Sequence, residues 1–321
     1  DFAKVLGALS EAPPLPMDLA PGTRIASFEV RAVLGRGGMG VVYDALDHRL
    51  ERPVALKLAR ARSGDRRAAS RLLAEARALA RLTHPNVVTV YEVGELPEEA
   101  GVYIAMEQVR GRTLRRWLEE AAPSRDDVLA VLRASGEGLR AAHGSGLVHR
   151  DFKPDNVFVT TDGRVKILDF GIARIVGSAT EKDSFDAGEL GALTLGFASL
   201  EMLQGDNEPH PADDVYALGL TAYLLFSGKH PFDGKHAVEA LNAGMSPEPL
   251  RNVKRHQWKA IEGALRLKRK DRTPSAEVFL KQFSGKTRRN RVLLAAVVVL
   301  ALSSGYFAWQ STQREGPAVT F

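Results

Sequence analysis

Cysteine is absent from the 321 residues of the chain. This absence excludes disulfide bonds, thiolate zinc sites and a cysteine nucleophile, and it fits a reducing compartment. Aromatic residues are also scarce, at 7%, but apolar residues at 45% and charged residues at 26% are ordinary for a globular protein. The net charge of +5 is too small to indicate nucleic-acid binding. Composition and length therefore leave a folded chain of one large or two small domains.

Long apolar runs are absent except for one segment near the C-terminus. Residues 292–309 are 18 residues without a charge, and as a helix they would reach about 27 Å, which matches a bilayer core. The basic segment 285–291 precedes them, and Tyr306 and Trp309 lie at the far end, where interfacial aromatic residues belong. We expect a single transmembrane helix in the inner membrane, with everything before it cytoplasmic and residues 310–321 beginning an extracytoplasmic segment. A buried core helix is the alternative.

The rest of the chain divides into a leader and one folded block. Residues 1–22 are rich in proline without helical periodicity and are predicted to be flexible. Residues 23–109 contain five β-like runs and one helical segment, whereas residues 110–284 are mainly helical in pattern. The runs are Phe28–Leu34, Val41–Ala45, Val54–Leu58, Val87–Val93 and Val102–Glu107, and the helix is Ala68–Leu82. This order predicts an α+β fold with a small five-stranded lobe followed by a larger helical lobe.

A glycine-rich segment lies between the first two β-like runs. Gly35, Gly37 and Gly40 have the spacing G-x-G-x-x-G, in which a backbone without Cβ atoms can approach phosphate groups. A strand rather than a helix follows the glycines, which disfavours a dinucleotide-binding fold. A hairpin that serves only as a turn is the alternative.

Lys57 lies in an apolar β-like run, where a lysine is costly unless an anion meets it. Glu75, in the following helical segment, is a candidate ion partner that could steady Lys57 for a phosphate. A lysine in solvent on an edge strand is the alternative.

Three chemical groups lie close together in the segment His149–Asn156. The Asp151 carboxylate can accept a hydroxyl proton, the Lys153 ammonium can neutralise transferring charge, and the Asn156 amide oxygen can bind a metal. Asp169 follows the next β-like run, and a hairpin turn signal at residues 162–163 predicts that Asn156 and Asp169 lie side by side. Two oxygen ligands together with phosphates indicate a magnesium site.

These motifs, in this order and spacing, resemble the eukaryotic-type (Hanks-type) Ser/Thr protein kinases, and specifically the membrane-anchored bacterial ones. The resemblance extends from the glycine-rich segment to Arg272. It implies a bilobal protein kinase fold, ATP and Mg²⁺ as cofactors, with Mn²⁺ as a substitute, and transfer of the ATP γ-phosphoryl group to protein hydroxyls.

The resemblance also implies roles for individual residues. Asp151 is implied to accept the substrate proton and Lys153 to contact the γ-phosphate, while Lys57 holds the α- and β-phosphates and pairs with Glu75. Asn156 and Asp169 are implied metal ligands. The implied nucleotide-binding residues are Leu34, Gly35, Gly37, Gly40, Val42, Ala55, Lys57, Met106, Glu107 and Val109, with Met106 as gatekeeper and Glu107 and Val109 in the hinge.

Further matches to the family are structural. Asp214 resembles a buried aspartate that braces the catalytic loop, and Arg272 is implied to pair with Glu201. His149 is predicted to be a packed scaffold residue rather than a base. The remaining histidines, His143 among them, lack metal-ligand spacing and are predicted to lie at the surface.

Two features bear on substrates and regulation. The segment Leu193–Glu201 lacks the glycine and both prolines of the family pattern, which bears on peptide preference rather than on phosphate chemistry. Arg150, next to Asp151, is of the kind that can bind a phosphate and order the activation loop. The candidate phosphate acceptors in that loop are Ser178, Thr180, Ser184 and Thr194. Acidic residues in place of a phosphate are one interpretation of the loop, and a loop without fixed structure is the favoured one.

The sequence thus predicts a Ser/Thr protein kinase that acts on protein substrates and autophosphorylates in trans, as a possible dimer, in transmembrane signalling. A kinase-fold, nucleotide-binding scaffold with lost or restricted transfer activity is the alternative. Nucleic-acid binding is not expected, because the short basic runs at residues 60–62 and 267–270 contain no aromatic residue.

Overall fold

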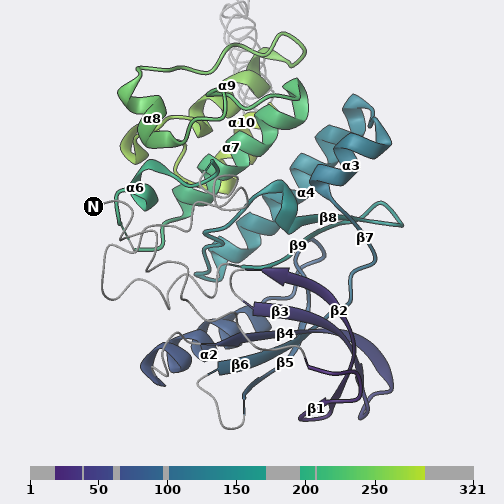
Figure 1. The fold of residues 1–321 in the computed structure, drawn as a ribbon. Helices are drawn as coiled ribbons and strands as arrows, with labels where there is room; N and C mark the ends of the chain where they lie inside the picture. Colours follow the sequence, from purple (N-terminus) through teal and green to yellow (C-terminus); the bar gives the residue numbers. More distant parts are fainter. Residues whose placement is uncertain are drawn as a thin grey trace, which may run out of the picture.

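The computed structural model describes residues 19–37, 40–60, 66–96, 101–170, 196–206 and 208–285. Strands β1 to β6 and helix α2 form the lower lobe in Figure 1, and the helices from α3 onward form the upper one. The predicted bilobal α+β architecture is therefore confirmed. The predicted membrane span and the four candidate phosphate acceptors lie outside the described residues.

The small lobe is an antiparallel sheet with the strand order β1-β2-β3-β4-β6-β5. Its elements are β1 Arg24–Ile25, β2 Phe28–Gly37, β3 Gly40–Asp47, β4 Arg52–Arg60, α2 Arg66–Ala80, β5 Val90–Glu95 and β6 Gly101–Met106. The five predicted strands are present, but the prediction of five was wrong by one. Strand β1 has only two residues, too few to show an alternating pattern, and it joins the sheet through its pairing with β2.

Strand β4 shows how the two faces of this sheet are filled. Its alternate residues point to opposite faces, so that Leu56 packs in a cluster with Tyr43 while Ala55 and Ala59 pack in the cluster that contains α2. Lys57 lies between Ala55 and Ala59 and shares their face. The predicted apolar stripe of α2 is buried on that same face, which places Lys57 among the residues that join the sheet to the rest of the molecule.

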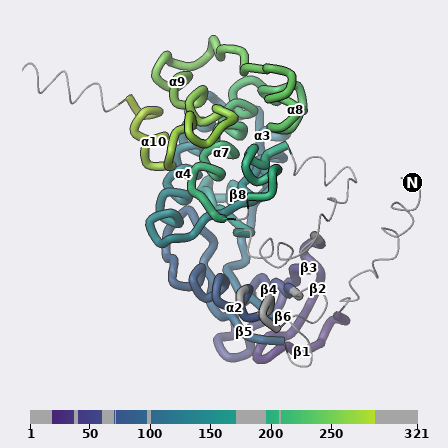
Figure 2. The backbone as a smooth tube through the Cα atoms, turned by 90° about the vertical axis from the view of Figure 1, so that its left-hand side faces the viewer, coloured from purple at the N-terminus to yellow at the C-terminus, as the bar shows by residue number. Residues whose placement is uncertain are grey.

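The large lobe is built around the buried helix α7. Its elements are β7 Gly111–Thr113, α3 Leu114–Ala121, α4 Arg125–Gly144, the 3-10 turn η2 Pro154–Asn156, β8 Val157–Thr160, β9 Val165–Ile167, α6 Leu200–Leu203, α7 Pro211–Ser227, α8 Ala237–Asn242, α9 Arg255–Ala264, the 3-10 turn η4 Arg269–Asp271 and α10 Ala276–Ser284. Helix α10 lies beside α4 and α9, away from the small lobe (Figure 2). Among the helices of the described residues, none combines the length and apolar character that a membrane crossing requires.

The loop that follows α2 joins the small lobe to β9 of the large lobe. The Val88 N–H donates to the Ile167 carbonyl at 3.0 Å, and the Ile167 N–H donates to the Asn86 carbonyl at 2.9 Å. Val87 consequently forms an isolated bridge with Ile167, which is why β5 begins at Val90 and not at the predicted Val87. The loop therefore fixes the small lobe against β9, the strand that leads to Asp169.

Gly138 allows α4 to approach this junction closely. A Cβ atom at this position would lie 2.7 Å from Ile167 Cδ1 and 3.0 Å from the Asn86 carbonyl oxygen. We expect Gly138→Ala to lower the free energy of unfolding by about 1–3 kcal/mol, because the added methyl overpacks the junction. Urea denaturation measures the change.

Gly144→Ala in the same helix is the matched control. A Cβ atom there meets nothing within 4 Å, so the higher helix propensity of alanine should leave this variant unchanged or slightly stabilised. Equal stability of the two variants would contradict the close approach at Gly138.

Candidate active site

The glycine-rich segment forms the hairpin end of β2 and β3. Gly40 has a φ of +142°, and a Cβ atom on it would lie 2.0 Å from the Leu58 carbonyl oxygen of β4. Val41 pairs with Leu58 in register, so the start of β3 can approach β4 this closely only with glycine at position 40. The hairpin of β2 and β3 therefore lies beside the strand that carries Lys57, and Gly35 is the register partner of Val42.

Lys57 is buried and forms an ion pair with the large lobe. Its side chain lies between Val42 of β3 and Ile104 of β6 in the sheet register, and its Nζ is 2.8 Å from Asp169 Oδ1. The contact described for Lys57 is thus with Asp169, and its pairing with Glu75 stays a prediction. The sequence favoured the acid on the next helix, whereas the tertiary fold brings a residue 112 positions away into contact.

Asp169 has an unusual backbone and an altered acidity. Its φ is +50°, in the left-handed region. Desolvation opposes ionisation of this carboxyl, but the charge and hydrogen bond of Lys57 outweigh desolvation, so the pKa of Asp169 is lowered. Asp169 is therefore a carboxylate near neutral pH and is available as an oxygen ligand.

Asp151, Lys153 and Asn156 are brought together as predicted. The Asn156 Nδ2 donates to the Asp151 carbonyl at 2.7 Å and to Asp151 Oδ2 at 2.9 Å, and Lys153 Nζ lies 3.0 Å from Asp151 Oδ2. The predicted hairpin is present as β8 and β9. The Leu168 N–H donates to the Asn156 carbonyl at 2.8 Å, which aligns the backbone next to Asp169 with Asn156.

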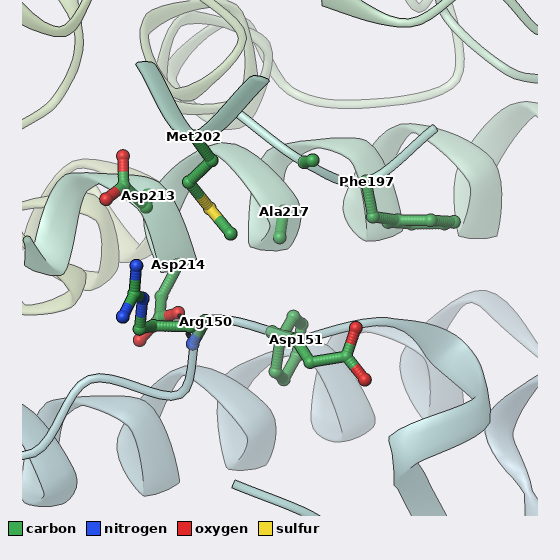
Figure 3. Close-up of a pocket in the computed structure, with 9 residues that line it drawn as sticks. Arg150, Asp151, Phe197, Met202, Asp213, Asp214 and Ala217 are labelled. Atoms are coloured by element: carbon green, nitrogen blue, oxygen red, sulfur yellow. Dashed lines mark hydrogen bonds between the residues drawn. The ribbon is translucent and has the colours of Figure 1, made fainter. Parts of the chain in front are cut away.

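The start of this loop is held by one buried carboxylate. Asp214 of α7 accepts hydrogen bonds from the backbone N–H groups of His149, at 2.7 Å, and Arg150, at 2.8 Å, which confirms its predicted bracing role. Figure 3 shows the Asp214 side chain beside Arg150, with the Asp151 carboxylate farther along the loop. Burial opposes ionisation of Asp214, but the hydrogen bonds and charges of His143 and His149 together outweigh burial, and the pKa of Asp214 is lowered.

Two histidines differ in how well the sequence predicted them. His149 is fully buried and lies 4.6 Å from the Phe170 ring, so its predicted scaffold role is confirmed. Burial lowers the pKa of His149. The prediction that His143 lies at the surface is wrong, because its side chain is only 8% exposed and its Nε2 is 2.8 Å from Asp214. A buried aspartate such as Asp214 needs several polar partners, and this need is the signal that could have indicated its contact with His143.

Some of the predicted adenine-binding residues pack in the same apolar cluster, and Leu34 does not. Val42, Ala55, Met106 and Val109 pack in one apolar cluster, and Ala55 pairs with Met106 in register. Leu34 lies outside both described apolar clusters and is 53% exposed.

Glu107, the first hinge residue, is engaged on both its backbone and its side chain. Its N–H donates to the Thr89 carbonyl at 2.8 Å, and its carboxylate pairs with Lys166 at 2.7 Å. Lys166 was not singled out by the sequence and ties the hinge to β9.

The atypical segment before Glu201 is fastened to the large lobe by charged groups. Arg272 Nη2 lies 2.8 Å from Glu201 Oε2, which confirms the predicted pair. Ser199 caps α6 and donates from its hydroxyl to Asp213 at 2.8 Å. Arg269, which the sequence did not indicate, bridges Asp213 and the loop after α6. These contacts hold residues 196–206 in place without the prolines of the family pattern.

The donor set fits a magnesium–nucleotide complex. Among the described residues, no group of three or more His, Cys, Asp or Glu could hold a metal ion. Mg²⁺ is commonly bound by one or two protein oxygens together with substrate phosphates, and Asn156 and Asp169 offer two such oxygens. Because the Nδ2 of Asn156 is directed at Asp151, its Oδ1 is the atom presented to a ligand.

Comparison with known proteins points to one family. Residues 28–298 match the family model described as "Protein kinase domain". The serine/threonine-protein kinase PknL of Mycobacterium tuberculosis is 41% identical over 213 residues, covering 65% of this chain and 51% of PknL. The serine/threonine-protein kinase pkn3 of Myxococcus xanthus is 32% identical over 295 residues, covering 88% of this chain and 54% of pkn3. The chain thus spans about half the length of these relatives.

Solved structures agree on the fold. The crystal structure of the Mycobacterium tuberculosis PknI kinase domain is 28% identical, covers 83% of this chain and 99% of that domain, and has a TM-score of 0.63.

The buried pair of Glu201 with Arg272 allows a test of the site's support. Arg272 is fully buried and pairs with Glu201 at 2.8 Å and with Asp213 at 3.6 Å. Glu201→Gln removes the closer of these two charges, and we expect the free energy of unfolding to fall by about 1.5–3 kcal/mol. Burial opposes ionisation of Glu201, but Arg272 and the backbone N–H of Arg269 together outweigh burial and lower the pKa of Glu201. The stabilisation is therefore present above the unfolded pKa of about 4.3 and is lost as pH falls through the lower folded value.

Urea denaturation between pH 7 and pH 3 measures this effect. The difference between wild type and Glu201→Gln should stay constant down to about pH 5 and shrink below it. Glu262→Gln is the control, because its 3.0 Å pair with Arg266 is exposed and should change stability by less than about 0.5 kcal/mol. Equal effects of the two substitutions would contradict a buried support.

Proposed function

The chain belongs to the protein kinase family, and we propose that it is a serine/threonine kinase that transfers the γ-phosphoryl group of ATP to protein hydroxyl groups. The observation that carries this proposal is the meeting of both lobes at one place. Lys57 of the small lobe contacts Asp169, and the Asn156 carbonyl is bonded to the residue before Asp169. A cation and two oxygen ligands beside the carboxylate of Asp151 are the groups that phosphoryl transfer needs.

Each group has a task that its position supports. Asp151, oriented by Asn156 and Lys153, accepts the proton of the attacking hydroxyl. Lys153 and Lys57 offset the negative charge of the phosphates. Asn156 and Asp169 would hold Mg²⁺, which would supply further neutralisation of the phosphate charge when bound. Positioning and charge neutralisation account for most of the catalysis in this class of reaction.

The competing function, a nucleotide-binding scaffold without transfer, rests on the altered segment before Glu201. The family pattern is changed there, but the segment is fastened to the lobe by Ser199, Glu201 and their partners. Transfer is therefore the function we favour, and the unusual sequence bears on which peptides are accepted.

We also propose that the kinase phosphorylates itself and is regulated through Arg150. An arginine beside the catalytic aspartate can bind a phosphorylated activation loop, and the candidate acceptors are Ser178, Thr180, Ser184 and Thr194. Phosphorylation between neighbouring molecules is favoured if the chains are confined to a membrane.

Anchoring in the inner membrane is a further proposal. It is supported by the uncharged residues 292–309, the basic segment 285–291 before them and the aromatic residues at the far end. The kinase domain then lies on the cytoplasmic side, as part of a transmembrane signalling protein.

Loss of the proposed base should abolish phosphoryl transfer. We expect Asp151→Ala to lower autophosphorylation on serine and threonine by about 10²-fold or more, since general-base catalysis contributes on that order. Mass spectrometry of the purified full chain after incubation with Mg–ATP measures both the extent and the sites. Lys57→Met should lose activity as well, because the cation that faces the phosphates is removed.

Asp162→Ala is the control for this experiment. Asp162 is an exposed carboxylate at the β8–β9 turn, and its removal should leave phosphorylation near the wild-type level. Undiminished labelling in Asp151→Ala would refute the base assignment, and absence of labelling in the wild type with all protein substrates would support the scaffold.

The membrane proposal makes its own prediction. The double variant Val297→Arg/Val298→Arg should move the chain from the carbonate-resistant membrane fraction to the soluble fraction, because each arginine at a helix centre costs about 2.5–3.5 kcal/mol of insertion. The variant Val297→Leu/Val298→Leu serves as control and should remain in the membrane fraction. A wild-type chain found only in the soluble fraction would refute the anchor.

A further inference from the structure

An arginine of α3 reaches the loop that carries the proposed active site. Arg115 is the second residue of α3, and its Nε and Nη2 donate to the two oxygens of Asp155 at 2.8 and 2.7 Å. Asp155 lies in η2, between Lys153 and Asn156. The contact is a two-point fork, which fixes the direction of a carboxylate as well as its distance.

The position of Asp155 makes this contact relevant to the chemistry. Asp155 directly precedes Asn156, whose side chain holds Asp151 and is the proposed metal ligand. Since η2 is a single turn of three residues, displacement of Asp155 displaces Asn156 with it. A contact that fixes Asp155 therefore also fixes the oxygen ligand and the base.

The loop then has two supports, one at each end. Asp214 of α7 holds its beginning through the N–H groups of His149 and Arg150. Arg115 of α3 holds its end through Asp155. The residues between these supports are those to which the proposed function assigns the proton acceptor and the γ-phosphate contact.

The contact between Arg115 and Asp155 acts through its geometry more than through its strength. Both side chains are partly exposed, at 31% and 40%, so the pair contributes modestly to overall stability. Its importance lies in geometry, because a planar guanidinium can form the fork and a lysine ammonium cannot.

We propose that Arg115 is a positioning residue that sets the orientation of the loop 151–156 through Asp155, and thereby the placement of Asn156 for magnesium and of Asp151 for the acceptor hydroxyl. This inference rests on the proposed kinase function for its catalytic consequence, but its structural part can be measured without any turnover.

The first readout is amide hydrogen exchange of the full chain without nucleotide. Arg115→Met should raise exchange in residues 150–157 and leave exchange in α7 and α9 unchanged. Arg115→Lys keeps the charge but loses the fork, and it should resemble Arg115→Met more than wild type. Arg112→Met is the matched control. Arg112 lies in β7, next to α3, and makes an exposed 3.0 Å pair with Glu120 of α3, and in the described part of the chain its side chain has no hydrogen bond or ion pair with the loop.

The second readout is ligand binding and turnover. With Mg²⁺ and a non-hydrolysable ATP analogue, Arg115→Met should need a higher Mg²⁺ concentration for half-maximal binding of the analogue. Its kcat should fall about tenfold to a hundredfold, with KM for ATP changed less, because the displaced groups act on the transferred phosphoryl group more than on adenine. The exchanged pair Arg115→Asp/Asp155→Arg should recover part of the loss.

The outcomes separate this inference from the function on which it rests. If wild-type exchange, binding and kcat are all retained in Arg115→Met, the positioning role is refuted while the kinase proposal stands. If exchange rises equally throughout the molecule, the pair serves only general stability and the inference is likewise refuted. If wild type transfers no phosphate at all, the kinase proposal fails, and local exchange and Mg²⁺-dependent binding still decide whether Arg115 orients the loop.

Discussion

The buried carboxylate of Asp214 is the constraint on which the proposed active site depends. An ionised carboxylate in a protein interior is tolerated only when hydrogen bonds replace its lost hydration. Asp214 obtains them from the backbone of His149 and Arg150 and from the His143 side chain. These bonds require the loop to turn at Arg150, whose φ is +62°, and the turn directs Asp151 away from the helix. The cost of burying one charge thus fixes the position of the proposed base.

The contacts between the two lobes also position residues of the proposed active site. Lys57 of the sheet pairs with Asp169, and the loop after α2 pairs with β9 just before Asp169. The small lobe therefore holds β9 through a backbone bridge and holds Asp169, just after β9, through an ion pair. Because Asp169 follows this strand directly, the metal-type ligand is positioned by the same contacts that keep the lobes together.

Particular residues show how far sequence reasoning could go. The apolar run Val54–Leu58 and the turn signal at residues 162–163 predicted β4 and the β8–β9 hairpin, because both depend on neighbours in sequence. The contact of Lys57 with Asp169 was not predicted, and His143 was wrongly placed at the surface, since each depends on a residue far along the chain. Arg115 and Arg269 gave no signal, because an arginine on a helix or in a short turn is usually solvated.

The sequence by itself determined the chemical inventory and its order: the glycine hairpin, the lysine in a β-run, and the carboxylates and amide of the two loops. Such groups are specified locally, by residue type and spacing. Only the tertiary structure decided which charges meet, because ion pairs and hydrogen bonds form between whatever side chains packing brings within about 3 Å. Packing brought Lys57 to Asp169, His143 to Asp214 and Arg115 to Asp155.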